Sequence, residues 1–173
     1  MKRYILTLMM SLMLFAGPAF AYGPQVREKS EAEKYIRQLA KVKASEINYV
    51  YISATMFKQM FSMLGTEVEL QGLSNPLASI KSLRKFITTG RTGYLVMKKH
   101  IAPFLQEDDN VMGMELMALS RENGTLSAIY SGEGNILVVN DDEDANEISV
   151  LFIAGLDYET FKAMGDSGLE LGF

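Results

Sequence analysis

The Asn123-Gly124 pair is the sequence feature that most restricts how this chain can fold. Both residues tolerate a positive φ angle, so the pair predicts a two-residue β-hairpin when strand patterns lie on either side of it. One strand pattern, over 111–120, precedes this pair, and three follow it, over 125–130, 136–139 and 148–154. The last third of the chain therefore predicts a four-strand antiparallel meander.

The first half of the chain alternates helix and strand patterns. Ser30-Glu31-Ala32-Glu33 is a capping box, because the Ser30 hydroxyl and the Glu33 carboxylate can each accept from the other's backbone amide. Apolar spacing predicts helices over 30–44 and 53–65, from Thr92 onward, and over 158–164, with strands over 47–53 and 82–88. The predicted fold class is α+β, with a mostly antiparallel sheet and the helices packed on one face.

The first 21 residues have the pattern of a signal peptide. Lys2 and Arg3 precede an apolar stretch over 4–15, and Ala19-Phe20-Ala21 is the small-x-small pattern that signal peptidase cleaves. The apolar stretch is shorter than the roughly 20 residues that a transmembrane helix needs. We expect cleavage near Ala21, a location in the periplasm or outside the cell, and no transmembrane segment in the mature chain. The predicted divisions are a signal peptide (1–21), an N-terminal helix (22–45), one α+β domain (46–164) and a flexible tail (165–173).

The composition narrows the possible chemistry. The chain has no Cys, which removes disulfides, thiolate metal sites and Cys nucleophiles. It has one His, and it lacks the glycine-rich motifs that bind phosphates and dinucleotides. The net charge of -4 does not suggest nucleic-acid binding. We therefore expect no cofactor and no nucleic-acid partner.

Two motifs resemble parts of catalytic or calcium sites. Gly165-Asp166-Ser167-Gly168 matches the string around a serine-protease nucleophile, but five residues follow it, so a flexible tail is the preferred interpretation. His100 is the only available base, and no acidic residue occurs over 70–106 to orient it. Asp142, Asp144 and Asn146 have the spacing of EF-hand ligands without the required Gly and Glu. A solvated acidic turn is preferred there, and a looser calcium site remains the alternative.

The spacing of Met112, Met114 and Met117 raises the possibility of a copper site, because thioether sulfur is a soft ligand. On one strand, however, Met112 and Met114 would share a face and Met117 would take the other. Methionines that fill the core are the preferred interpretation.

Charge is distributed unevenly along the chain. Residues 70–106 contain six basic and no acidic side chains, whereas residues 107–173 contain two basic and 15 acidic ones. The candidate patch for an anionic partner consists of Lys81, Arg84, Lys85, Arg91, Lys98 and Lys99. Two interpretations stay open. An anionic partner, such as lipid headgroups, lipopolysaccharide or an acidic protein surface, binds this patch, or the basic segment lies beside the acidic meander and the charges offset one another.

Several short segments over about residues 46–164 fit this order of elements, namely Tyr49-Val50-Tyr51-Ile52-Ser53, Met56-Phe57, 83–88, Asn123-Gly124, 136–139 and 148–157. On these segments the chain resembles the exported bacterial proteins of domain-of-unknown-function family 4252. The resemblance implies a small exported α+β domain of gram-negative bacteria, without an assigned activity or catalytic residues. Genes of the family are said to lie near extracytoplasmic sigma-factor systems, which implies a part in envelope regulation.

These observations favour a non-enzymatic envelope module that binds an anionic component or a protein partner. The first alternative is a periplasmic hydrolase or metal-dependent enzyme with a dispersed site, which would use acids such as Glu115 or Asp157. The second is an accessory partner in envelope-stress signalling, on the family resemblance alone. The oligomeric state and the place of the first two strands in the sheet stay open.

Overall fold

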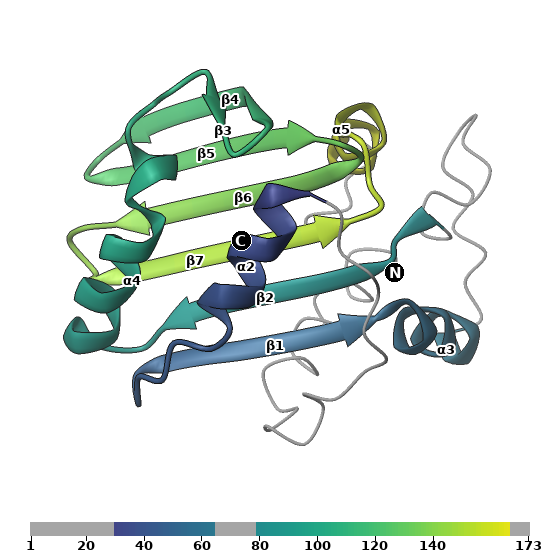
Figure 1. Cartoon of the computed structure of the whole chain (residues 1–173), viewed down its shortest axis with the longest axis horizontal. Coiled ribbons are helices and arrows are strands. Elements are labelled where there is room, and N and C mark those ends of the chain that lie inside the picture. The colour runs from purple at the N-terminus through teal and green to yellow at the C-terminus, as the bar shows by residue number, and fades with distance from the viewer. Residues whose placement is uncertain (1–29, 65–78, 167–173) are drawn as a thin grey trace.

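A computed structural model describes residues 30–64 and 79–166 of the chain, and these residues form one seven-stranded sheet with four helices (Figure 1). The strands are β1 (Ile47–Ser53), β2 (Ser82–Thr88), β3 (Asn110–Val111), β4 (Met114–Glu122), β5 (Thr125–Gly132), β6 (Asn135–Asp142) and β7 (Glu147–Ala154). The helices are α2 (Glu31–Leu39), α3 (Ala54–Leu64), α4 (Arg91–Leu105) and α5 (Tyr158–Asp166). The α+β class is confirmed. None of the helices in the described ranges is long and apolar enough to cross a membrane.

Strands β4 to β7 are consecutive neighbours in the sheet, which confirms the predicted meander. The β4–β5 connection is the expected hairpin, since φ is 48° at Asn123 and 80° at Gly124. A second turn of the same kind joins β5 to β6, where φ is 51° at Glu133 and 71° at Gly134. Positive φ at both central residues matches the twist of the flanking strands and fixes their register.

The predicted single strand over 111–120 is wrong, because a third tight turn divides it. Positive φ angles of 52° at Met112 and 76° at Gly113 reverse the chain between β3 and β4. Strand β3 pairs only with Met114 and Glu115, and the amide of Leu116 then donates to the Asp109 carbonyl at 2.9 Å. Only this short part of β4 is therefore covered on its outer side by β3 and the residue before it.

Strand β2 joins the N-terminal part of the sheet to the meander. It pairs with β1 on one side and with β7 on the other, so the full order is β1-β2-β7-β6-β5-β4-β3. Phe86 lies between Tyr49 of β1 and Val150 of β7, and the Tyr49 and Phe86 rings stack with centroids 4.8 Å apart. Strand β1 is therefore one edge of the sheet, and β3 with the rest of β4 forms the other.

Helices α2 and α4 cover one face of the sheet (Figure 1). The capping box of α2 forms as predicted, with the Glu33 amide donating to Ser30 Oγ at 3.0 Å. Ile36 of α2 and Ile101 of α4 are buried in one cluster with inward side chains of the meander. Helix α2 thus packs on the same core as the domain that follows it in sequence.

Helices α3 and α5 pack on the opposite face, so the expectation that all helices share one face is wrong for these two. Phe57 of α3 and Phe161 and Met164 of α5 belong to a second buried cluster. Its sheet members include Leu151 and Ile153, which alternate along β7 with members of the first cluster. Successive strand residues point to opposite faces, and β7 is apolar at both sets of positions, so both faces need cover.

Glu46, which precedes β1, fixes the start of α4. Its carboxylate accepts from the Gly93 amide at 2.9 Å, and its carbonyl accepts from the Thr89 amide at 2.8 Å. A carboxylate at a helix N-terminus satisfies an orphan amide and complements the helix dipole. A Cβ on Gly93 would lie 2.4 Å from the Glu46 carbonyl oxygen, so this close approach requires glycine.

Candidate binding edge

The structure does not bring the six candidate basic residues onto one surface. Lys81, Arg91 and Lys99 are exposed, whereas Arg84 is 5% exposed on the face that α2 and α4 cover. The Arg84 guanidinium donates to Ser82 Oγ at 3.2 Å and lies 4.8 Å from the centroid of the Tyr51 ring. Lys85 follows Arg84 on β2 and therefore points to the other face. Burial lowers the pKa of Lys85 despite the opposing charge of Glu147.

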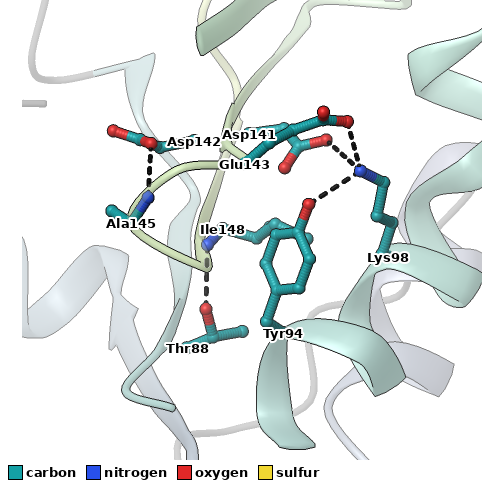
Figure 2. Close-up of polar contacts among 8 residues, drawn as sticks. All are labelled: Thr88, Tyr94, Lys98, Asp141, Asp142, Glu143, Ala145 and Ile148. Carbon is teal, nitrogen blue, oxygen red and sulfur yellow. Dashed lines mark hydrogen bonds and ion pairs between the residues drawn. The ribbon is translucent and has the colours of Figure 1, made fainter. Parts of the chain in front are cut away.

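Lys98 of α4 is engaged with the acidic end of the meander (Figure 2). Its ammonium group donates to Glu143 Oε1 at 2.6 Å and to the Tyr94 hydroxyl at 2.7 Å, and it lies 3.3 Å from Asp141 Oδ2. The Asp141 side chain is 5% exposed, and its Oδ1 has no partner in the described structure. This geometry favours the interpretation in which basic and acidic segments offset one another at this point of the fold.

The contacts of Lys98 shift the pKa values around it. Burial alone would lower the pKa of Lys98, but the hydrogen bonds with Glu143 and Tyr94 and the charge of Asp141 outweigh burial and raise it. The hydrogen bond with Lys98 lowers the pKa of Glu143, and burial raises the pKa of Tyr94. The lysine thus stays protonated at neutral pH, which suits an ion pair and does not suit a nucleophile.

The acidic β6–β7 turn was the candidate calcium site. In the part of the chain that the structure describes, no group of three or more His, Asp or Glu side chains is arranged to hold a metal ion. Asp142 Oδ1 instead accepts from the Ala145 amide at 2.8 Å and closes the β6–β7 turn.

His100 is exposed on α4, and Ser167 lies outside the described residues. Met114 is 1% exposed and Met117 is 36% exposed, so these two do not face a common site.

The two acids considered for a dispersed site occupy different elements. Glu115 is exposed on β4. Asp157 precedes α5, where Oδ1 accepts from the Thr160 amide at 2.8 Å and Oδ2 accepts from the Thr160 hydroxyl at 3.0 Å. The bond from the Thr160 amide lowers the pKa of Asp157. Asp157 therefore acts as the helix cap that the sequence predicted.

The outer edge of β4 is the most exposed strand surface in the described structure. Every residue from Met117 to Glu122 is exposed, and no strand among the described residues pairs with this stretch on its outer side. Met117 and Leu119 are 36% and 39% exposed. In the described ranges, Leu95 on α4 is the other exposed large apolar side chain. A β-bulge at Met117 shifts the register between Leu116 and Ala118. The name "β4 edge" is used below for residues 117–122.

The register shows which backbone groups of the β4 edge face outward. Glu122 and Thr125 flank a two-residue turn and therefore form a hydrogen-bonded pair. Hydrogen-bonded pairs alternate along antiparallel strands, so Ser120 and Ala118 also bond to β5. The amides and carbonyls of Leu119 and Arg121 then point away from β5. These are the groups that an added strand would use.

The surroundings of the β4 edge are acidic. Between Glu107 and Glu133 the chain carries six acidic side chains and one basic side chain, Arg121. Arg121 Nη2 lies 2.5 Å from Glu107 Oε1, and Nε donates to the same oxygen at 2.6 Å. Within the described ranges, no ion pair involves Glu115 or Glu122. Arg121 is thus engaged beside the edge, and residues 107–133 keep an excess of negative charge.

Sequence reasoning did not single out Met117 and Leu119 as surface residues, because their alternation is also that of a buried strand. The exposure depends on which strand ends the sheet, and that is decided by pairings between distant segments. Comparison of the chain with protein-family models, with curated proteins and with solved structures found no match. Any functional proposal must therefore rest on the geometry described above and on the sequence.

Proposed function

We propose that this protein is an exported, non-enzymatic binding module that takes up an extended segment of another protein along the β4 edge. Strand addition provides affinity through main-chain hydrogen bonds and selectivity through alternate side chains. Of the two kinds of partner suggested by the sequence, an anionic envelope component and a protein, the β4 edge favours the protein. The proposed setting is the periplasm or the exterior of a gram-negative cell, after cleavage near Ala21.

The observation that carries the proposal is the coincidence of two features on one strand. The β4 edge has outward-facing amides and carbonyls at Leu119 and Arg121 with no neighbouring strand among the described residues. It also carries Met117 and Leu119, which are two of the three exposed large apolar side chains among the residues that the structure describes. Edge strands are usually short, charged or covered, because an uncovered edge pairs with other chains. An edge of six residues that no described strand covers, and that carries apolar side chains, is therefore suited to pairing.

The alternative enzyme with a dispersed site has weaker support. Both carboxylate oxygens of Asp157 accept hydrogen bonds from Thr160, and the Lys98 ammonium group is paired with Glu143 and Asp141. The proposed part in envelope-stress signalling rests on the resemblance to family 4252. It is compatible with a binding module, since a signalling accessory protein also acts through a partner.

The experiment that tests the proposal compares partner capture by the wild type and by Leu119→Pro. Proline at this position removes an outward-facing amide and leaves the hydrogen bonds to β5 in place. Leu95→Lys is the matched control, because it removes an exposed leucine from a helix surface away from β4. Tagged full-length proteins are incubated with envelope extract, and bound proteins are identified by mass spectrometry.

We expect a set of proteins that binds the wild type and Leu95→Lys and is lost with Leu119→Pro. Circular dichroism spectra and melting curves of the three proteins establish that each is folded. Identical binding by all three folded proteins would contradict the proposal.

A further inference from the structure

We infer that the segment bound along the β4 edge is a basic extended peptide that alternates lysine or arginine with apolar residues. This inference rests on the proposed function and specifies the partner. It depends on three observations, namely the excess of negative charge around the β4 edge, the position of Glu115 and Glu122 on one face of the sheet, and the apolar Leu119 side chain on the other face.

Glu122 of the β4 edge and Glu115, which precedes the edge on the same strand, lie on the face opposite α4. Glu115 pairs with Ser131 and Glu122 pairs with Thr125, and these positions alternate with the inward positions Tyr130 and Leu126 that pack below α2 and α4. Ala118 and Ser120 lie between the two glutamates on the same face. An added strand along residues 117–122 would therefore place every second side chain beside a small surface that has the Glu122 carboxylate at one end and the Glu115 carboxylate just beyond the other. Lysine and arginine complement that surface.

The α4 face of the β4 edge has the opposite character. Leu119 lies on this face opposite Ala128, and Arg121 lies beside it opposite Leu126. Arg121 is already paired with Glu107, and its charge would repel a second cation on the same face. The side chains of an added strand that point to this face should therefore be apolar and contact Leu119. Together the two faces favour a peptide in which basic and apolar side chains alternate with a period of two residues.

A second copy of the same chain is a poorer occupant. Pairing of two β4 edges would bring two acidic surfaces together, including two copies of Glu115 and Glu122, with no free cation at either edge among the described residues. Like charges placed opposite each other on neighbouring strands are destabilising. Self-association through β4 is therefore kept as an outcome of the test.

The test measures binding of two synthetic peptides to the full chain by fluorescence anisotropy. One peptide alternates lysine with valine, and the other has threonine in place of each lysine. We expect the lysine peptide to bind more tightly, with an affinity that falls as ionic strength rises from about 0.05 to 0.5 M. Glu115→Gln combined with Glu122→Gln should weaken the lysine peptide about threefold to tenfold and leave the threonine peptide unchanged.

Two controls establish that binding occurs by strand addition. Leu119→Pro should abolish binding of the lysine peptide. N-methylation of alternate valines in the peptide should do the same without altering the protein, so the inference can be tested even if Leu119→Pro does not fold. A peptide that binds Leu119→Pro as well as the wild type, or that is insensitive to N-methylation, would overturn the inference.

The outcomes separate this inference from the proposed function. Equal binding of both peptides, lost with Leu119→Pro, would overturn the basic partner and leave strand addition supported. Absence of binding by the lysine peptide would also overturn the inference, while the capture experiment with envelope proteins decides the proposed function independently. A dimer that Leu119→Pro dissociates would identify a second copy as the occupant and would overturn the inference.

Discussion

Replacement of Lys98 by methionine tests whether its ammonium group stabilises the buried carboxylate of Asp141. The variant keeps most of the aliphatic volume on α4 and removes the charge that lies 3.3 Å from Asp141 Oδ2. It also removes the hydrogen bonds to Glu143 and Tyr94. Because only 5% of the Asp141 side chain is exposed, water cannot easily replace the missing ammonium group. We expect the folded state of Lys98→Met to be less stable than the wild type.

The magnitude follows from the burial of the two partners. Removing one partner of a fully buried ion pair costs about 3–5 kcal/mol. Lys98 is 34% exposed, however, so solvent partly screens its charge in the wild type. The expected loss of stability is therefore smaller than for a fully buried pair. The relevant range is that of a buried acceptor left unsatisfied, roughly 1–3 kcal/mol. We expect a loss near 2 kcal/mol, about 4–8 °C in melting temperature for a chain of this size.

The pH dependence has a defined sign. The raised pKa of Lys98 means that its contribution is complete below its unfolded pKa, about 10.4, and is lost as pH rises beyond it. The lowered pKa of Glu143 means that its contribution is present above its unfolded pKa, about 4.3, and is lost as pH falls through its folded pKa. The difference in stability between wild type and Lys98→Met should be largest from about pH 5 to 9 and should shrink above pH 10.

The assay is urea denaturation monitored by circular dichroism, repeated across this pH range. Lys99→Met is the matched control, because it removes the same charge from the next, exposed position of α4. Lys98→Met combined with Asp141→Leu should recover most of the loss, since apolar residues then replace the whole pair. Equal stability of Lys98→Met and Lys99→Met at neutral pH would refute the reasoning.

The remaining predictions concern two local structures. Asp157→Ala should lower stability by about 1 kcal/mol through loss of the α5 cap. Because the folded pKa of Asp157 is lowered, this difference should be present above about pH 4 and lost at lower pH, as denaturation curves would show. Gly93→Ala should lower the melting temperature, because its Cβ would lie 2.4 Å from the Glu46 carbonyl oxygen. Thr92→Ala, exposed on the same turn, is the control, and equal melting temperatures would contradict this prediction.

Local signals account for the parts of the fold that the sequence predicted. The Asn123-Gly124 hairpin and the Ser30 capping box are decided by residues within a few positions of one another, so their patterns suffice. The turn at Met112-Gly113 was missed, because methionine is not typical of a positive φ angle. Without that turn, β3 and the exposed stretch of β4 could not be distinguished.

Long-range contacts account for what the sequence could not supply. The basic and acidic segments were visible in the sequence, but no local pattern pairs Lys98 with Asp141. The predicted strand already separates Arg84 from Lys85 by alternation, but which face the helices α2 and α4 would cover depends on distant contacts. The position of α3 and α5 on the second face depends on the apolar residues of β7 at both sets of alternating positions. The β4 edge is defined only once the strand order is known.

The position of β7 has a consequence for the order in which the chain can assemble. Strands β6 and β7 form from neighbouring residues, whereas β2 pairs with residues about sixty to seventy positions later in the sequence. During synthesis, β1 and β2 emerge well before β7, the strand of the meander that pairs with β2. The side of β2 that faces β7 is fully paired only once Ala154 has been made. Local hairpins form faster than such distant pairings. A chain truncated before β7 would therefore leave two separate half-sheets, each with a newly exposed apolar edge.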